Sequence, residues 1–335
     1  MMKELNSSTI YYNALAIQHR GNFSALKRLK EKYPNWEKAF KREFKLKEDA
    51  HELSHELKKQ GVRLILQEDK DFPPLLQEIP HPPLALYCKG NIKIDKALAI
   101  VGTRKAGKPS LIASAEISKN LASLGLSIIS GLALGVDSYA HKGALATGGH
   151  TVAVLANGLD RIYPSSNNNL ANQILKNGGA LISEYPLGTE PLRNLFIARN
   201  RIISGLSQAV LVIEAPQKSG ALATARFAVE QNRDLYVLPG PARDKNFLGS
   251  NRLIQDGASL IIDAHDIAKD FGLETEGGKT VSNSLQFDKL SKMQTIIVIA
   301  LKKLSKPVGL DEIAQETRLE ISELQTNLTQ LMLDG

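Results

Sequence analysis

The sequence predicts a doubly wound α/β domain in the centre of the chain, with a mostly parallel sheet and a smaller helical segment on either side. Seven short runs are continuously apolar and rich in Val, Ile and Leu, which is typical of strands buried on both faces of a parallel sheet. They are ALAIVG, LSIISG, TVAVLANG, ALISEYP, AVLVIEAP, LYVLPG and ASLIID. Helix-length segments such as 109–124 and 138–147 separate most of them, and this alternation indicates helices on both faces of the sheet. A ligand site in such a fold lies beyond the carboxyl ends of the strands.

The bulk composition favours a globular chain of more than one domain. Its 335 residues exceed the usual range of a single domain, and 43% of them are hydrophobic, which is enough for packed cores. The one cysteine, Cys88, cannot form an internal disulfide, and no apolar run reaches the roughly 18 residues of a membrane span. The first residues lack the apolar core of a signal peptide. We therefore expect a cytoplasmic protein with no membrane partner.

The formal net charge of +7 is unevenly distributed. Residues 1–60 carry 13 Lys and Arg against 8 Asp and Glu, whereas residues 311–335 carry 1 against 6. A basic surplus in the N-terminal and central parts favours a polyanionic partner. A solvated basic surface that serves solubility explains the same numbers, so charge alone leaves both interpretations open.

In chain order, residues 1–58 are expected to form a small helical domain. AIQHRGNFSALKRLKEKY has the apolar spacing of a helix, and Asn35 is a suitable cap for a helix that begins at Trp36. The Lys and Arg residues between Lys27 and Lys47 either contact phosphates or form a solvated surface. A run of charges on short helices is more often a solvated surface.

Residues 59–265 form the expected sheet domain. VRLILQ, directly after Gly61, predicts a strand. Five prolines between Pro73 and Pro83 then indicate an extended connection to the first strand of the parallel series.

Beyond the sheet domain, residues 266–285 are rich in Gly, Ser and Thr and predict a flexible linker. Residues 286–335 predict three helices with a turn at 319–321, as in a helix-turn-helix module. The segment 320–333, which would be the reading helix, contains no Lys or Arg. DNA readers need cations for the phosphate backbone, so a protein-interaction module is favoured.

Glycines, hydroxyls and cations directly follow the predicted strands. They occupy 103–105, 132–135, 159–164, 187–189, 217–220 and 241–243. After the fourth strand comes RNLFIARNR, residues 193–201, which concentrates three arginines and an aromatic ring before the helical IISGLS. These segments are therefore the candidates for a ligand site.

The first of these turns is similar to an incomplete P-loop. Gly102 to Lys108 satisfies GxxxxGK, but Pro109 stands where a Ser or Thr hydroxyl would bind magnesium. Proline suits the first position of a helix, so an ordinary helix start explains the segment and ATP hydrolysis is disfavoured.

A dinucleotide site is disfavoured as well. No GxGxxG follows a predicted strand, and Gly131 and Gly135 have a different spacing. Asp137 is expected to cap a helix from Ser138, where its carboxylate would stand in the place of a pyrophosphate.

The sequence shows no catalytic or metal-binding pattern. The seven histidines lack ligand spacing, and His51 and His55 are expected to face solvent. Ser130 and Ser219 precede glycines but have no obvious base. We therefore predict no catalytic residues, no metal and no cofactor, although a triad assembled from distant residues is not visible in a sequence.

Binding of single-stranded nucleic acid uses the groups that are present. Lys and Arg contact phosphates, and an aromatic ring such as Phe196 stacks on a base. Alternatively, Phe196 is a core residue and the arginines pair with Glu184 or Glu214. Binding is the better account, because several cations are expected on one rim with few acids nearby. The candidate DNA-binding residues are Gly102, Thr103, Arg104, Ser130, Gly131, Arg193, Phe196, Arg199, Asn200, Arg201 and Lys218.

The same segments resemble the DprA/Smf family, bacterial DNA-processing proteins of natural transformation. The resemblance extends from about residue 61 to 262. It includes PPLLQEIPHPPLALYCKGN, VGTR, SGLALGVD, GGHTVAVLANGLDRIYP, ISEYPLGTEP, FIARNRIISGLS, SGALATARFA and GSNRLIQDGA. So many motifs in one order are not expected by chance.

The resemblance implies an extended Rossmann-like domain that binds single-stranded DNA without a cofactor and forms a homodimer through that domain. It also implies protection of incoming DNA, loading of RecA onto it and displacement of single-strand-binding protein. The flanking domains are implied to be a SAM-like helical N-terminal domain and a winged-helix-like C-terminal domain. By motif, Arg104 of VGTR and Phe196, Arg199 and Arg201 of FIARNR line the DNA pocket, and Arg193 stands where the family tends to have a cation.

Two features depart from the family, and one alternative remains. Ile197 replaces a proline that is usual there, which is expected to alter the approach of a loop. The chain ends at Gly335, where a winged helix would begin its hairpin. The alternative is a nucleotide phosphoribohydrolase of the lysine-decarboxylase-like group, whose PGGxGTxxE signature corresponds to SGALAT at 219–224, with no glutamate before Glu230.

Overall fold

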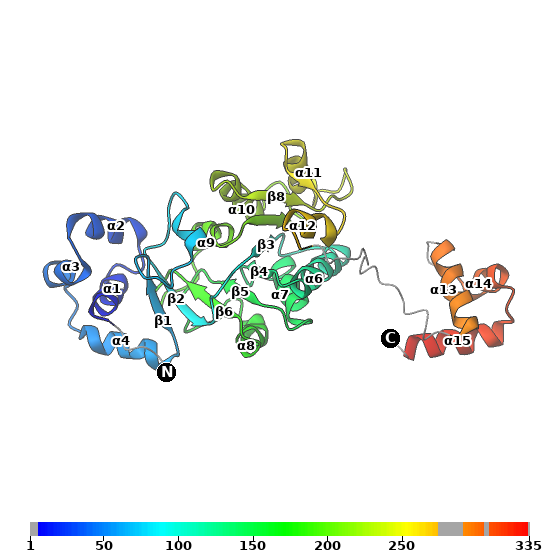
Figure 1. The fold of residues 1–335 in the computed structure, drawn as a ribbon, viewed down its shortest axis with the longest axis horizontal. Coiled ribbons are helices and arrows are strands. Elements are labelled where there is room, and N and C mark those ends of the chain that lie inside the picture. Colours follow the sequence, from blue (N-terminus) through cyan, green and yellow to red (C-terminus); the bar gives the residue numbers. More distant parts are fainter. Residues whose placement is uncertain (1–5, 274–290, 305–307, 334–335) are drawn as a thin grey trace. The chain divides into compact units, whose positions relative to one another are not determined.

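The computed structural model describes residues 6–273, 291–304 and 308–333. They belong to two compact units, Met1–Glu274 and Thr275–Gly335, and Figure 1 shows the ribbon of each. The first unit begins with the helices α1 (Ser7–Gln18), α2 (Phe23–Lys32), α3 (Trp36–Glu43) and α4 (Ala50–Lys59). Each is capped by an Asn or Asp side chain that accepts a backbone N–H of the first turn. The predicted helix start at Trp36 is confirmed.

These four helices share a hydrophobic core with the sheet. Leu15 of α1 and Leu26 of α2 are buried in one cluster with residues of the first two strands. The buried Tyr87 hydroxyl of the second strand donates a hydrogen bond of 2.9 Å to the Asn13 side chain of α1. The helical segment is therefore packed onto one end of the sheet, within the same compact unit.

The sheet has nine strands in the order β1-β2-β6-β5-β4-β3-β7-β8-β9. Their bounds are β1 (Arg63–Leu66), β2 (Ala85–Gly90), β3 (Ala97–Val101), β4 (Ser127–Ser130), β5 (Thr151–Val154), β6 (Ala180–Ser183), β7 (Ala209–Val212), β8 (Asp234–Val237) and β9 (Ser259–Leu260). All neighbouring pairs from β6 across to β9 are parallel, whereas β1 and β2 add an antiparallel hairpin at one edge. The predicted mostly parallel, doubly wound sheet is confirmed.

Two strands differ from the sequence-based expectation. β2 lies where an extended connection was expected, because the prolines that suggested a break end at Pro83 and leave Ala85–Gly90 free to pair. β9 was expected to be buried, but both of its residues are exposed, since it is a two-residue strand at the edge of the sheet.

Helices cover both faces of the sheet (Figure 1). Residues of α9 and α10 pack on one face, and residues of α6, α7 and α12 pack on the other. The helices of this region are α5 (Pro74–Gln77), α6 (Lys108–Ser123), α7 (Val136–Leu145), α8 (Asn168–Lys176), α9 (Arg193–Gly205), α10 (Gly220–Glu230), α11 (Leu248–Gln255) and α12 (Ala264–Asp270), with a 3₁₀ turn at Ser165–Asn167.

The strand order reverses between β3 and β7, which creates a crevice at their carboxyl ends. The chain adds β4, β5 and β6 on one side of β3 and then crosses to add β7, β8 and β9 on the other. Crevices at such switch points are the usual ligand sites of open α/β sheets. The loop after β3 and the first turns of α7, α9 and α10 are candidates to surround this crevice.

Three local expectations are corrected by the helices. The segment 193–201 is the first part of α9 and not a loop, so Ile197 is an exposed helical residue. The expected linker starts too early, because residues 266–270 belong to α12, which has a capping box of Asp263 and Asp266 and a buried Ile267. The rest of that linker, from 274 to 285, lies outside the described residues. Asp137 is not the cap of α7, which begins at Val136 after Gly135.

The described residues of the second unit form a cluster of three helices, as the sequence predicts. They are α13 (Lys292–Leu304), α14 (Leu310–Thr317) and α15 (Ile321–Leu333). Ile297, Ile313 and Leu324 form its core, one from each helix. Arg318, with a φ of 56°, ends α14 in the left-handed conformation and produces the turn into α15.

Candidate nucleic-acid interface

Close backbone packing builds the floor of the crevice. A Cβ on Gly135 would lie 2.4 Å from the Thr103 carbonyl oxygen, and Gly135 has a φ of 78°, so this position requires glycine. The Thr103 N–H donates a 2.7 Å bond to the Glu214 carbonyl at the end of β7. The loop after β3 is thus fixed against both the β4–α7 loop and β7.

That loop confirms the interpretation of Pro109 as part of a helix start. α6 begins at Lys108 with Pro109 in its first turn, and the Gly107 N–H donates to a Glu214 carboxylate oxygen at 3.1 Å. The buried Glu214 carboxylate therefore accepts the hydrogen bond of an amide that a P-loop would present to a phosphate.

An aromatic platform beside the exposed Arg104 guanidinium lies at the rim of the crevice. The Arg104 guanidinium carbon lies 5.0 Å from the centroid of the Phe196 ring, and the Tyr163 ring is centred 5.5 Å from it. Arg104 and Tyr163 are exposed and Phe196 is half-buried. Neither Arg104 nor Arg193 has an acidic partner within 4 Å among the described residues. Cations beside an accessible ring are the groups that bind phosphates and stack on bases.

Arg199 lies beneath this platform. Its guanidinium donates to the carbonyl oxygens of Gly131, at 3.1 Å, and Val154. It is also 5.7 Å from the Phe196 centroid, and only 4% of the residue is exposed. Burial lowers the pKa of Arg199 to about 10, so it stays charged at neutral pH. Arg199 thus joins β4, β5 and Phe196 from below.

Asp137 is a second buried acid of this region, in addition to Glu214. Its carboxylate accepts the backbone N–H groups of Gly131 and Ala133, at 3.1 and 3.4 Å. Burial raises its pKa above the ordinary value, and Arg199 opposes that shift. The β4–α7 loop is therefore held by a carboxylate on one side and a guanidinium on the other.

Arg201 points to the opposite side of α9. Successive residues are about 100° apart around a helix, so residues 199 and 201 face nearly opposite directions. Arg201 forms a two-pronged ion pair with Glu184, at 2.6 and 2.7 Å, and donates to the His81 carbonyl at 2.9 Å. Both members of the pair are buried. The expectation that all the arginines of this segment converge on one rim is therefore wrong, and the alternative of a Glu184 pair holds for Arg201.

The remaining candidates are distributed around the crevice. Ser130 and Gly131 are buried, and the Ser130 hydroxyl donates to the Ile100 carbonyl at 2.7 Å. Asn200 donates to the Gly220 carbonyl at 3.2 Å and so links α9 to the start of α10. Lys218 is exposed in the turn before α10. Gly102 and Thr103 belong to the loop after β3 and are partly exposed.

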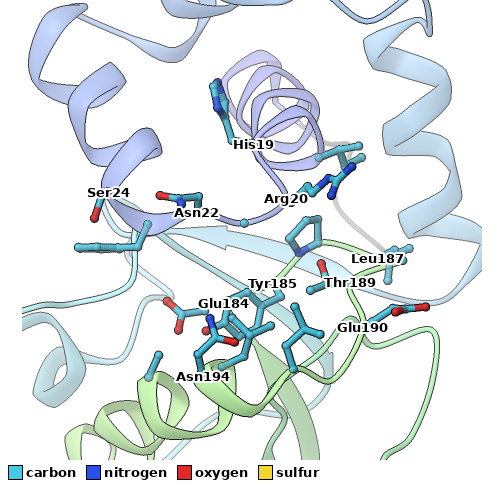
Figure 2. A pocket seen from close by; sticks show the side chains of 18 of the residues that line it. His19, Arg20, Asn22, Ser24, Glu184, Tyr185, Leu187, Thr189, Glu190 and Asn194 are labelled. Carbon is cyan, nitrogen blue, oxygen red and sulfur yellow. The ribbon is translucent and has the colours of Figure 1, made fainter.

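A second hollow lies on the Arg201 side of α9 (Figure 2). It is a pocket of about 1120 Å³ between the turn that joins α1 to α2 and the connection from β6 to α9. Figure 2 shows Arg20 and Asn22 on the first side and Glu184, Thr189 and Asn194 on the other. The pocket is accessible to solvent, because Arg20, Asn22 and Asn194 are exposed.

Several groups that could act as catalysts are engaged or buried. His141 is fully buried and bonded to the Thr151 hydroxyl at 2.7 Å, and burial lowers its pKa to about 3. The Ser219 hydroxyl caps α10. Burial raises the pKa of the Cys88 thiol to about 11. His51 and His55 face solvent, as expected. In the described ranges, no group of three or more His, Cys, Asp or Glu side chains is placed to hold a metal ion, and none of the helices there is long and apolar enough to cross a membrane.

Sequence reasoning missed two groups of the site. Tyr163 lies in the segment 159–164, beyond the end of β5 at Val154; the sequence marked that segment as a candidate but did not single out the ring. Asp137 was interpreted as a helix cap, whereas its carboxylate reaches back to the preceding loop. No periodicity distinguishes these two geometries.

Comparison with known proteins gives one consistent family. The family described as DNA recombination-mediator protein A matches residues 63–272. Protein Smf of Synechocystis sp. is 36% identical over 314 residues, which are 84% of this chain and 79% of that protein. DNA processing protein DprA of Streptococcus pneumoniae is 40% identical over 226 residues, which are 67% of this chain and 78% of that protein.

Solved structures similar to the chain include two of DNA processing protein A. The X-ray structure of DNA processing protein A from Streptococcus pneumoniae has 36% identity and a TM-score of 0.62, and the match covers 70% of this chain and 81% of that one. A structure that addresses the single-stranded DNA binding mode of DNA processing protein A from Helicobacter pylori has 31% identity and a TM-score of 0.57. That match covers 63% of this chain and 97% of the other.

Proposed function

The chain belongs to the family of DNA recombination-mediator protein A, and from this premise we propose that it binds single-stranded DNA at the crevice between β3 and β7. The observation that carries the proposal is the exposed Arg104 beside the half-buried Phe196 ring, 5.0 Å from its centroid, at the topological switch point. A cation and an aromatic face in one place suit a flexible strand whose bases are free to stack.

The candidate residues have different roles in this proposal. Arg104, Arg193 and Lys218 are exposed cations that contact phosphates, and Phe196, flanked by Tyr163, stacks on a base. Arg199 orients Phe196 and the β4–α7 loop from beneath. Asn200, Ser130, Gly102, Thr103 and Gly131 shape the crevice by backbone approach and by the bonds described above. Arg201 supports the site through its pair with Glu184.

The finer proposal concerns the biological process and the partners. We propose that the protein protects incoming single-stranded DNA in the cytoplasm during natural transformation, loads RecA onto it and displaces single-strand-binding protein. It acts as a homodimer through the sheet domain. The exposed apolar side chains of Leu260, 49% exposed, and Ile262, 78% exposed, at the edge strand β9 support self-association there.

We propose that the protein is not an enzyme and needs no cofactor or metal. The amide of Gly107 is already engaged by Glu214, and the hydroxyls of Ser130 and Ser219 are bonded to or capping backbone. The phosphoribohydrolase alternative requires a glutamate shortly after the segment 219–224. The first glutamate beyond that segment is Glu230, the last residue of α10. Release of free base from a nucleoside monophosphate would support that alternative.

The decisive experiment measures the affinity of the full chain for a labelled oligo(dT) by fluorescence anisotropy between about 50 and 200 mM salt. Arg104→Ala is expected to weaken binding by about 1–3 kcal/mol and to reduce the salt slope by about 0.7 for each phosphate that the variant no longer neutralises. Lys119→Ala is the matched control, because Lys119 is exposed near the C-terminal end of α6, away from the crevice. An Arg104→Ala protein that is folded and keeps both its affinity and its salt slope refutes the proposal.

A further inference from the structure

The pocket on the Arg201 side of α9 is too large to be explained as a gap in a core. Its volume of about 1120 Å³ exceeds the ~300–1,000 Å³ of most small-molecule sites. It is bounded by two connections, residues 19–24 of the α1–α2 turn and residues 184–192 before α9. A hollow of this size and openness suits an extended chain better than a compact ligand.

The pocket and the crevice lie on opposite sides of α9 but share its first turn. The first turn of α9 contributes Asn194 and Leu195 to the pocket and Phe196 to the platform. The loop that carries Tyr163 is joined to the wall of the pocket, because the Gly158 N–H donates to the Thr189 carbonyl at 3.0 Å. A strand that runs from the Phe196 ring over the start of α9 would therefore reach the pocket.

The charges of the pocket leave one cation available. Glu184 is neutralised by Arg201 at 2.6 Å, and Glu190 lies 3.8 Å from Arg161. Arg20 is exposed, and no acidic group lies within 4 Å of it among the described residues. It also adopts a φ of 52°, a conformation that Gly or Asn would adopt with less strain. Arg20 thus presents a guanidinium without an acidic partner in the described part of the chain, at a position whose left-handed backbone conformation is unfavourable for arginine.

The walls offer rings and hydrogen-bonding side chains for bases. Phe23 is half-buried, with the Arg201 guanidinium 5.5 Å from its centroid, and Phe227 of α10 is also half-buried at the pocket wall. Asn194 is exposed there, and its side-chain amide both donates and accepts hydrogen bonds. Rings with polar neighbours bind bases with little dependence on sequence.

A neighbouring acidic groove disfavours one of the paths that a bound polyanion could take from the pocket. It shares Ile17, Leu187 and Gly188 with the pocket but is lined by Glu48, Glu52 and Glu56. Phosphates are repelled from that side, so the Arg20 pocket is the favourable continuation and the acidic groove is its end.

From these observations we propose that the pocket between the α1–α2 turn and the β6–α9 connection is a second subsite for the same DNA strand. This inference rests on the proposed binding of single-stranded DNA at Phe196. Arg20 contacts a phosphate, and the rings of the pocket receive bases of the segment that extends beyond the platform. The N-terminal helices thereby lengthen the site, and they matter only for strands long enough to reach them.

The test is a length series of oligo(dT), from about 4 to about 16 nucleotides, measured by anisotropy with the full chain. Arg20→Asn removes the charge and keeps a residue that tolerates the left-handed backbone. We expect it to weaken the longest oligonucleotides by about threefold to tenfold and to leave the shortest unchanged. Arg42→Gln, at an exposed arginine on α3 outside the pocket, is the control and is expected to bind like the unmodified protein at every length.

Each outcome has a definite meaning. Equal affinity of Arg20→Asn and the unmodified protein at all lengths overturns the second subsite, and so does an equal loss at all lengths, because the pocket would then belong to the first site. A loss of the same size in Arg42→Gln shows that a general charge effect is at work and also overturns it. Failure of the underlying proposal is distinguishable, because Arg104→Ala would then bind normally even to the shortest oligonucleotides.

Discussion

Replacing Arg199 tests whether this arginine supports the crevice from beneath. Arg199→Met keeps an unbranched side chain but removes the donors to the Gly131 and Val154 carbonyls. It also removes a positive charge that lowers the pKa of Asp137 and so counteracts the effect of burial. Loss of one partner from a buried charged network costs about 3–5 kcal/mol. We expect a loss of this size in the free energy of unfolding, together with weaker DNA binding.

The size of this loss depends on pH through Asp137. Its folded pKa lies above the ordinary value of 3.8, so the folded state binds the proton more tightly than the unfolded state. The stability that this provides is complete below the unfolded pKa and is lost as the pH rises through the folded pKa. Arg199→Met raises the folded pKa further, so the deficit relative to the unmodified protein grows with pH. Asp137→Asn in the same chain is expected to remove this growth and to recover about 1–2 kcal/mol.

Urea unfolding followed by tryptophan fluorescence measures these quantities. Trp36 is the single tryptophan and is buried in the first unit, so its signal reports on that unit. The set is the unmodified protein, the two single variants and the double variant, from about pH 4 to pH 8. A deficit for Arg199→Met below about 1 kcal/mol, or one that does not change with pH, contradicts the assigned role.

Two further variants separate stacking from support. Phe196→Ala is expected to weaken oligo(dT) binding by about 1–3 kcal/mol through loss of the stacking surface, with little change in melting temperature; normal binding with a lower melting temperature would instead make Phe196 a core residue. Glu184→Gln leaves the Arg201 charge buried and unpaired and is expected to cost about 3–5 kcal/mol of stability, with Glu190→Gln, from an exposed pair, as a control that costs no more than about 1 kcal/mol. Equal stability of the two glutamine variants would show that the buried pair is not a support.

The parallel part of the fold could be predicted because each of its strands is a short apolar run followed by a turn. Ala97–Val101 and Ala209–Val212 are fully buried, and both were evident from their Val, Ile and Leu content. Ala85–Gly90 was not, because it lies directly after a proline-rich segment and pairs with β1 and β6. Its partners are remote in sequence, and no local pattern specifies such pairing.

The candidate site could be proposed from the sequence as a set of residues, but its geometry could not. Arg104 follows a strand, and its exposure beside Phe196 agrees with the expectation. The division between Arg199 and Arg201 could not be foreseen, because residues 193–201 were expected to precede the helix. In an extended segment, residues two apart would point to the same side, whereas in a helix they diverge. One assignment of secondary structure therefore decided which carbonyls and acids each arginine meets.

The helical state of α9 also explains why one short segment serves two surfaces. Phe196 and Arg199 are three residues apart and share the face toward the crevice, whereas Arg201 turns toward Glu184 and the N-terminal helices. A buried ion pair contributes little net stability compared with apolar packing, but it is costly to break. The pair therefore fixes the rotation of α9 about its axis, and that rotation sets where Phe196 and Arg104 meet. A strand bound at the platform would consequently be sensitive to changes in the Glu184–Arg201 pair even where it does not contact that pair.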